Sequence, residues 1–204
     1  SALPFLVNAG IQNGGQTCSA SSRILVHRSR YNEVVDHMSQ KYKDLIVRPA
    51  INDGALGPLI SERQKSIVED FISKGQRLNL VAQGKIDSSA PTKGHYVAPH
   101  LFADVPEDHI LAKDEIFGPV QVIMPFDTEE EAISIANGTD YGLVASIWTN
   151  DGARQMRLAK KLKSGQVFIN NYGAGGGVEL PFGGRGFSGH GREKGFEALY
   201  GFST

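Results

Sequence analysis

Apolar side chains recur every three or four positions between residues 29 and 47, a spacing that predicts an amphipathic helix. Ser29 is the expected N-cap. Pro49 closes the region, because the residue before a proline disfavours helical backbone. The apolar positions are Tyr31, Val34, Val35, Met38, Tyr42 and Leu45.

A second helix is predicted from a capping box, formed by Ser61 and by Gln64 three residues later. In such a box the serine hydroxyl accepts a hydrogen bond from the glutamine N–H, and the glutamine side chain reaches back to the serine N–H. Gly75 is the expected end of this helix. The side chains expected to face inward are Ile67, Val68, Phe71 and Ile72.

Two more helices are predicted in the second half of the chain. Thr128 and Glu131 form another capping box, and Gly138 ends the helix that they open. Asn150 and Gly165 are the expected caps of the next helix.

Short apolar runs between the helices predict strands, and helix and strand signals alternate along the chain. Such alternation is typical of an α/β fold, a three-layer αβα arrangement with an open, mostly parallel sheet. At 204 residues the chain is expected to form one domain with one core. The runs are 23–28, 77–84, 96–102, 119–126, 142–149 and 165–170.

Charge and composition exclude several classes of protein. The chain has 21 Lys and Arg against 22 Asp and Glu, so it lacks the basic surface of a nucleic-acid binder. No apolar run approaches the roughly 20 residues of a membrane span, so no membrane partner is expected. A lone cysteine forms no intrachain disulfide, which favours a reducing, cytoplasmic location. Both ends resemble cuts in a longer protein, because the chain begins without Met and ends without a cap.

The only cysteine, Cys18, follows a Gly-Gly-Gln turn in the stretch NAGIQNGGQTCSASSR. Two interpretations are open from this context alone. If the segment after Gly14 and Gly15 turns into a short helix, backbone N–H groups would point at the sulfur, favour the thiolate and offer an oxyanion site. Alternatively, Cys18 is a small buried packing residue.

Two further stretches have a composition that suits a site. DEIFGPV, residues 114–120, places an acidic pair before an aromatic residue and a Gly-Pro turn; it suits either a ribose-binding carboxylate or a solvated turn. The glycine-rich stretch 170–195 contains Gly184, Gly186 and Gly189 in a G-x-G-x-x-G spacing, but no strand precedes it. A loop that lines a pocket is the better interpretation of that stretch.

Four segments taken together resemble the aldehyde dehydrogenase superfamily in order and approximate spacing: GGQTCSASSR, EIFGPV, NGTDYGL and PFGGRGFSGHGREKG. The resemblance implies an enzyme that oxidises an aldehyde with NAD or NADP through a thiohemiacetal and a thioester on a cysteine. Cys18 matches the catalytic cysteine of the family, and its backbone N–H an oxyanion donor.

The resemblance also assigns residues to the cofactor and to the substrate. Glu115 matches the family's acidic residue on the nicotinamide ribose, Phe117 its aromatic residue beside the nicotinamide, and Gln64 a glutamine near the cofactor. The residues implied for the substrate pocket are Thr17, Ser19 and Phe182.

This chain departs from the family pattern at two glycines. Gly186 stands where the family often has a lysine, so the role of that lysine is not expected here. Gly176 stands where a bulky residue often narrows the substrate tunnel, which suggests a wide or mobile mouth that accepts polar or large aldehydes.

The resemblance further implies that parts of the active site lie outside this chain. In the family, the NAD(P)-binding domain precedes the cysteine and carries the general base and an oxyanion-hole asparagine. The isolated chain is therefore expected to be inactive, while the full-length enzyme is expected to be a homo-oligomer, either dimer or tetramer. The choice between NAD and NADP and the identity of the aldehyde stay open.

Two other classes of function are compatible with the sequence. A cysteine hydrolase or acyltransferase would pair Cys18 with a histidine base, whereas a non-catalytic assembly domain would use exposed sheet edges to bind a partner. The candidate bases are His27, His95, His100 and His190.

Overall fold

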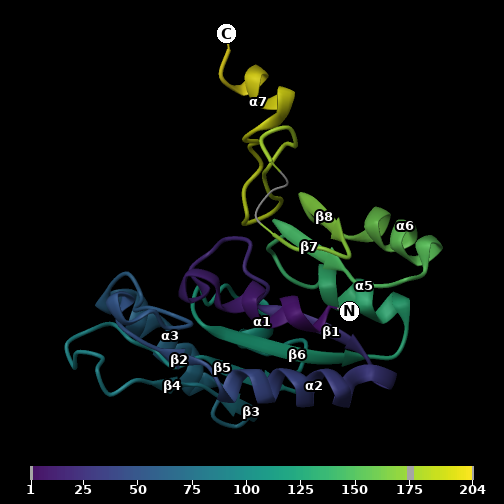
Figure 1. Cartoon of the computed structure of the whole chain (residues 1–204). Helices are drawn as coiled ribbons and strands as arrows, with labels where there is room; N and C mark the ends of the chain where they lie inside the picture. The colour runs from purple at the N-terminus through teal and green to yellow at the C-terminus, as the bar shows by residue number, and fades with distance from the viewer. Residues whose placement is uncertain (1, 174–176, 204) are drawn as a thin grey trace. The chain divides into compact units, whose positions relative to one another are not determined.

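The computed structural model describes residues 2–173 and 177–203. Contacts within the chain divide it into two compact units, each described here by itself. The first unit, residues 3–127, is called the sheet unit. The second unit comprises the chain from Thr128 onward together with Ala2. Figure 1 shows the elements of both units.

A four-stranded sheet with the order β1-β6-β5-β3 forms the centre of the sheet unit. β6 pairs in parallel with both β1 and β5, and β3 pairs antiparallel with β5 at the edge. A separate short pair, β2 with β4, is also parallel. The mostly parallel sheet is confirmed. The strands are β1 (Arg23–His27), β2 (Ile46–Val47), β3 (Asn79–Gln83), β4 (Lys85–Ile86), β5 (His100–Ala103) and β6 (Val120–Phe126).

Helices cover both faces of this sheet, as an αβα arrangement requires. Leu101 of β5 packs into a cluster with side chains of α1 and α2. The next side chain, Phe102, points to the opposite face. There it adjoins Gly75 at the end of α3, beside Leu111 of α4. The helices are α1 (Leu3–Ile11), α2 (Arg28–Lys43), α3 (Glu62–Lys74) and α4 (Ile110–Lys113), with 3-10 turns η1 (Gln12–Gly15) and η2 (Ala50–Asn52).

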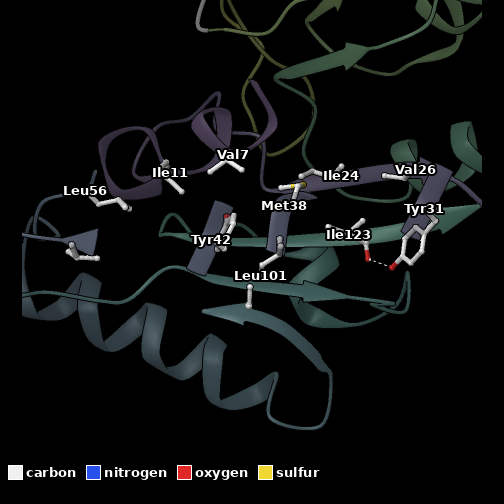
Figure 2. Packing of buried hydrophobic residues seen from close by; sticks show 12 residues of the cluster. Val7, Ile11, Ile24, Val26, Tyr31, Met38, Tyr42, Leu56, Leu101 and Ile123 are labelled. Carbon is white, nitrogen blue, oxygen red and sulfur yellow. Dashed lines mark hydrogen bonds between the residues drawn. The ribbon is translucent and has the colours of Figure 1, made fainter. Parts of the chain in front are cut away.

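The core of the sheet unit lies between the sheet and helices α1 and α2 (Figure 2). Met38 and Tyr42 of α2 are 0% exposed, as are Leu101 and Ile123 on the strands. Burying each such side chain stabilises the fold by about 1.5–3 kcal/mol. The helical spacing in the sequence thus located the buried face of α2 correctly.

The predicted N-cap of α2 was wrong by two residues. The helix begins at Arg28, and His27 is the cap. Its ring nitrogen Nδ1 accepts from the Ser29 N–H at 3.2 Å and also lies 2.8 Å from the Ser29 hydroxyl. Ser29 therefore lies inside the first turn of α2, where it is bound by His27, the residue that caps the helix.

Both ends of α3 lie where the sequence predicts them. The Ser61 hydroxyl accepts from the Gln64 N–H at 3.2 Å, and the Gly75 N–H donates to the last turn. Of the side chains expected to face inward, Val68 is fully buried, whereas Ile67 is exposed.

Helices and strands alternate in the second unit as well, and β7 pairs with β8 in parallel. Thr128 caps α5 through the Glu131 N–H at 3.1 Å, and Gly138 ends that helix, as predicted. The elements are α5 (Glu129–Asn137), β7 (Val144–Ile147), α6 (Gly152–Lys161), β8 (Gln166–Ile169) and α7 (Gly195–Gly201).

Both predicted caps of α6 were wrong. Asp151, one residue beyond Asn150, accepts from the Arg154 N–H at 3.0 Å. A carboxylate at this position also faces the positive end of the helix dipole. The helix ends at Lys161, and Leu162 is its C-cap. Gly165 serves a different purpose, because a Cβ there would overlap the carbonyl oxygen of Gly183.

Across the part of the chain that the structure describes, no helix combines the length and apolar character needed to cross a bilayer.

Candidate active site

The chain reverses direction sharply just before Cys18. After α1 the backbone passes through η1, where three consecutive residues have positive φ: Asn13 (53°), Gly14 (64°) and Gly15 (76°). Asparagine and glycine are the residues that adopt this left-handed conformation most readily. The Gly-Gly pair before the cysteine is thus required by the backbone.

Cys18 lies in a turn, and the helical segment expected after it does not form. The Ala20 N–H donates to the Thr17 carbonyl oxygen at 2.8 Å, which closes the turn over Cys18. The N–H groups of Ser21 and Ser22 then bind the carbonyls of Ala9 and Ala20, which directs the chain into β1 and away from a helix.

The Cys18 side chain is exposed. This exposure contradicts the interpretation of Cys18 as a buried packing residue. Among the hydrogen bonds of the described residues, none uses the Cys18 N–H. That N–H is therefore available to a bound molecule beside the thiol.

Gln16, two residues before Cys18, fastens this turn with its side chain. Its Nε2 donates to the Asn13 carbonyl oxygen at 3.0 Å, and Asn13 Nδ2 donates back to the Gln16 carbonyl oxygen at 3.1 Å. Gln16 Oε1 accepts from the Ile60 N–H at 2.9 Å, at the entrance to α3. The residue pattern alone does not single out Gln16.

The segment Glu115–Gly118 alternates between solvent and core. Glu115 and Phe117 are exposed, whereas Ile116 and Gly118 are buried. Phe117 has a positive φ of 54°, an unfavourable conformation for a bulky residue. A carboxylate and an aromatic ring therefore stand together on the open side of the segment, and the backbone that presents them must be held in place.

Gln64 of α3 holds that backbone. Its Nε2 donates to the Phe117 carbonyl oxygen at 2.9 Å and to the Ile116 carbonyl oxygen at 3.3 Å. The capping box at Ser61 is thus only half formed, because the glutamine side chain is used elsewhere. This glutamine, expected near a cofactor, holds the backbone of the segment that presents Glu115 and Phe117.

The Cys18 loop and the Glu115–Gly118 segment pack directly against each other. A Cβ on Gly15 would overlap the carbonyl oxygen of Gly118. A Cβ on Gly118 would in turn overlap Val68 of α3. These two glycines allow the nucleophile loop, the Glu115–Gly118 segment and α3 to meet.

A buried polar pair lies beneath the loop. Gln121 of β6 and Tyr42 of α2 are both 0% exposed, and the Tyr42 hydroxyl donates to Gln121 Oε1 at 2.5 Å. Gln121 Nε2 donates to the carbonyls of Ser21, at 2.6 Å, and Leu6, at 3.1 Å. The signal in the sequence was a lone amide within the apolar run 119–126.

A comparison with protein families now decides the assignment. The model of the aldehyde dehydrogenase family matches residues 1–204. This chain belongs to the aldehyde dehydrogenase family.

Relatives and solved structures agree with this assignment. The aldehyde dehydrogenase DhaS of Bacillus subtilis is 38% identical over 200 residues, which are 97% of this chain and 40% of that protein. The crystal structure of an aldehyde dehydrogenase from Burkholderia cenocepacia is 57% identical, with a TM-score of 0.97. The match covers all of this chain and 43% of that one. An NAD+ complex of the Bacillus cereus aldehyde dehydrogenase is 38% identical with a TM-score of 0.89, over 97% of this chain and 40% of that one.

The chain thus spans about 40% of the length of the relatives that it matches. The fold expected from the resemblance, an α/β domain of the aldehyde dehydrogenase type, is confirmed.

The residues expected around the aldehyde lie in both units. In the sheet unit, Thr17 and Ser19 flank Cys18 and are half-buried, and the Thr17 hydroxyl donates to the Gln12 carbonyl oxygen at 3.3 Å. Phe182 lies in the second unit, half-buried, and exchanges two backbone hydrogen bonds with Glu193. Gly176, expected to widen the mouth, lies outside the described residues.

Gly186 explains one departure from the family pattern. Its φ is 59°, and a Cβ there would overlap the Asp140 carbonyl oxygen. This aldehyde dehydrogenase chain therefore requires glycine where the family often has lysine.

Three of the candidate histidines are held by partners other than Cys18. His27 caps α2, His95 Nδ1 lies 3.1 Å from a Glu62 carboxylate oxygen, and buried His100 binds the Ala98 carbonyl oxygen through Nδ1 at 2.8 Å. Burial lowers the pKa of His100, although the Ala98 contact opposes this. No hydrogen bond among the described residues joins a histidine to Cys18.

Proposed function

We propose that residues 1–204 are the cysteine-bearing catalytic domain of a longer, NAD(P)-dependent aldehyde dehydrogenase that oxidises an aldehyde to a carboxylic acid. The observation that carries this proposal is the exposed Cys18 thiol on a loop packed, through Gly15 and Gly118, against the segment that presents Glu115 and Phe117. Membership of the family supports it.

The chemistry begins at Cys18. Its thiolate adds to the carbonyl carbon of the aldehyde, and the carbonyl π electrons move to the oxygen. The Cys18 N–H donates to that oxygen, which stabilises the developing negative charge. Glu115 and Phe117 would hold the nicotinamide end of NAD(P)+, which would supply the acceptor for the hydride of the thiohemiacetal carbon. The resulting Cys18 thioester is hydrolysed by water, which releases the carboxylic acid and restores the thiol.

The exposed side of the Glu115–Gly118 segment suits the nicotinamide riboside part of the cofactor. The Glu115 carboxylate accepts hydrogen bonds from ribose hydroxyls, and the Phe117 ring offers an aromatic face. Gln64 contributes by holding the Phe117 carbonyl. The NAD+ complex of the Bacillus cereus relative supports the same cofactor class for this chain.

Thr17 and Ser19, in the sheet unit, are assigned to the aldehyde in this proposal. Thr17 and Ser19 are the immediate neighbours of the nucleophile, so their side chains bound the space that an aldehyde must enter. Phe182, in the second unit, is assigned to the aldehyde because the resemblance to the family implies an aromatic residue at this position.

The rest of the catalytic machinery comes from another part of the full-length enzyme. A general base that activates water contributes about 10²–10⁴ in rate, and one lost oxyanion donor costs about 10²–10³. The isolated chain is therefore inactive and binds NAD(P)+ weakly. The full-length enzyme is a cytoplasmic dimer or tetramer.

Replacement of Cys18 tests the proposed function. The full-length enzyme should form NADH with one or more of a panel of aldehydes, and Cys18→Ala should lower the rate to background. Ser22→Ala is the matched control, because it removes an exposed hydroxyl four residues after Cys18, outside the residues assigned to the aldehyde, and should retain most of the wild-type activity. Turnover by Cys18→Ala would contradict the proposal.

Experiments on the isolated chain test whether residues 1–204 alone bind the cofactor and turn over. Calorimetry with NAD+ should show no micromolar binding, and absorbance should show no NADH from the same aldehydes. Micromolar affinity or measurable turnover by residues 1–204 alone would contradict this part of the proposal.

A further inference from the structure

The Gln16 side chain joins two parts of the site through opposite ends of one carboxamide. Its Oε1 accepts from the Ile60 N–H at 2.9 Å, and its Nε2 donates to the Asn13 carbonyl oxygen at 3.0 Å. Ile60 directly precedes Ser61, the N-cap of α3. One side chain thus fastens both the turn before the nucleophile and the first residue of the α3 entrance.

This contact is a direct hydrogen-bonded link between the Cys18 loop and the start of α3. Among the described residues, the Ile60–Gln16 hydrogen bond is the one that joins residues 12–19 to residues 57–74. The loop itself contains residues with left-handed backbone conformation. Among the hydrogen bonds of the described residues, none uses the N–H of the exposed Cys18 to fix its position. The position of the thiol relative to α3 therefore depends on Gln16.

The same helix supports the segment opposite the thiol. Gln64, one turn into α3, donates to the Phe117 carbonyl oxygen at 2.9 Å. Gln16 and Gln64 thus attach the nucleophile loop and the Phe117 backbone to one helix end. The same five residues, 60–64, therefore limit the movement of both the Cys18 loop and the Phe117 backbone.

We infer that Gln16 is a positioning residue, which sets the Cys18 thiol against the Phe117 segment so that hydride leaves the thiohemiacetal in the correct direction. This inference rests on the proposed function and goes beyond it by assigning a role to a residue that touches neither substrate nor cofactor. Misplacement of reacting groups by about 1 Å can cost on the order of 10²-fold in rate.

The test compares two variants of the full-length enzyme. Gln16→Met keeps the length of the side chain and removes its bonds to both Ile60 and Asn13. Asn13→Gly is the matched control: it removes the Asn13 Nδ2 bond in the same turn, suits the positive φ, and leaves the Gln16–Ile60 bond in place.

Three readouts separate positioning from general destabilisation. The rate is expressed per thiol titrated with iodoacetamide in protein that elutes as folded enzyme on size-exclusion chromatography, so that unfolded protein does not count. The isotope effect is measured with hexanal or benzaldehyde deuterated at the carbonyl carbon. The alkylation rate of Cys18 reports the reactivity of the thiol alone.

Gln16→Met should lower kcat per thiol about tenfold or more and raise the isotope effect. Its alkylation rate and its KM for NAD+ should stay within about twofold of wild type, and Asn13→Gly should resemble wild type in all readouts. An unchanged kcat per thiol, or a fall in alkylation that matches the fall in kcat, would overturn the inference. Failure of the proposed function would look different, because wild type would then form no NADH or Cys18→Ala would still form it.

Discussion

Gly15 and Gly118 lie so close that a Cβ on Gly15 would overlap the Gly118 carbonyl oxygen. This contact joins the loop of the nucleophile to the segment that presents Glu115 and Phe117. Two residues more than 100 positions apart in the sequence thus decide whether the two halves of the proposed site meet.

Gly15→Ala should therefore reduce turnover of the full-length enzyme by more than tenfold. The added methyl group must displace the Gly118 backbone, and catalysis is sensitive to shifts of about 1 Å. The measurement is kcat per titrated thiol.

Gly14→Ala is the control for this change. Gly14 has a similar positive φ, 64°, but a Cβ there meets only side-chain atoms at ordinary distance. Both variants carry the cost of left-handed alanine, roughly 1–2 kcal/mol. Equal activities in the two variants would show that backbone strain, and not the Gly118 contact, causes the loss.

Gln64→Met should raise the KM for NAD+ more than it lowers kcat. The variant keeps a good helix former but removes the donor that holds the Ile116 and Phe117 carbonyls, so the positive φ of Phe117 loses its support. Steady-state kinetics with varied NAD+ measures the change.

Ser61→Ala separates this effect from damage to α3. Loss of an N-cap costs about 0.5–2 kcal/mol of helix stability, and the variant leaves the Gln64 carboxamide in place. A similar rise in KM for both variants would contradict a specific role for Gln64.

Local signals in the sequence were sufficient to predict most of the fold. The capping residues predicted where α3 and α5 begin and end, and the spacing of apolar residues predicted the buried face of α2. Both features depend only on residues within one or two helical turns. The caps at Ser29 and Asn150 were predicted wrongly, because a nearby residue with an acceptor side chain, His27 or Asp151, accepts from an N–H of the first turn instead.

The site was harder to predict, because its supports are long-range contacts. Residue type and order singled out Cys18, Glu115 and Phe117, but the helix expected after Cys18 was replaced by a turn once Ser21 bound the Ala9 carbonyl. Nothing local indicates that Gln16 reaches Ile60, 44 residues away. Gln121 stands out in the sequence as a lone amide in an apolar strand, but its partner, Tyr42, is 79 residues away and could not be predicted from the sequence.

Tyr42→Phe should lower the melting temperature of the protein. It leaves Gln121 Oε1 buried without its donor, and an unsatisfied buried acceptor costs about 1–3 kcal/mol. Hydrogen exchange at Ser21 and Ser22, which follow the nucleophile turn, should become faster. Tyr200→Phe removes a hydroxyl from an 82% exposed tyrosine and serves as the control, with no expected shift. Equal shifts in the two variants would argue against the buried pair.

Glu129 should make the second unit sensitive to acid. Its carboxylate accepts from Arg157 Nη2 at 2.7 Å and Arg154 Nε at 2.6 Å, and these two bonds lower its pKa from 4.5 to about 2. Because the folded pKa is the lower one, the stabilisation is complete above pH 4.5 and is lost as the pH falls towards 2. The contacts join α5 to α6, so their loss should loosen both helices.

The fluorescence of Trp148, the only tryptophan in the chain, reports unfolding of this unit during an acid titration. Glu129→Gln should be less stable than wild type at neutral pH, and the difference should shrink between pH 4.5 and 2 because wild type loses its ion pairs over that range. Glu130→Gln, an exposed neighbour in the same helix turn, provides the control for removal of one charge.

Since both arginine contacts are partly open to solvent, added salt should reduce the difference in stability between Glu129→Gln and wild type. Identical acid titrations for Glu129→Gln and wild type would mean that the contacts with Arg154 and Arg157 do not hold α5 against α6 in solution.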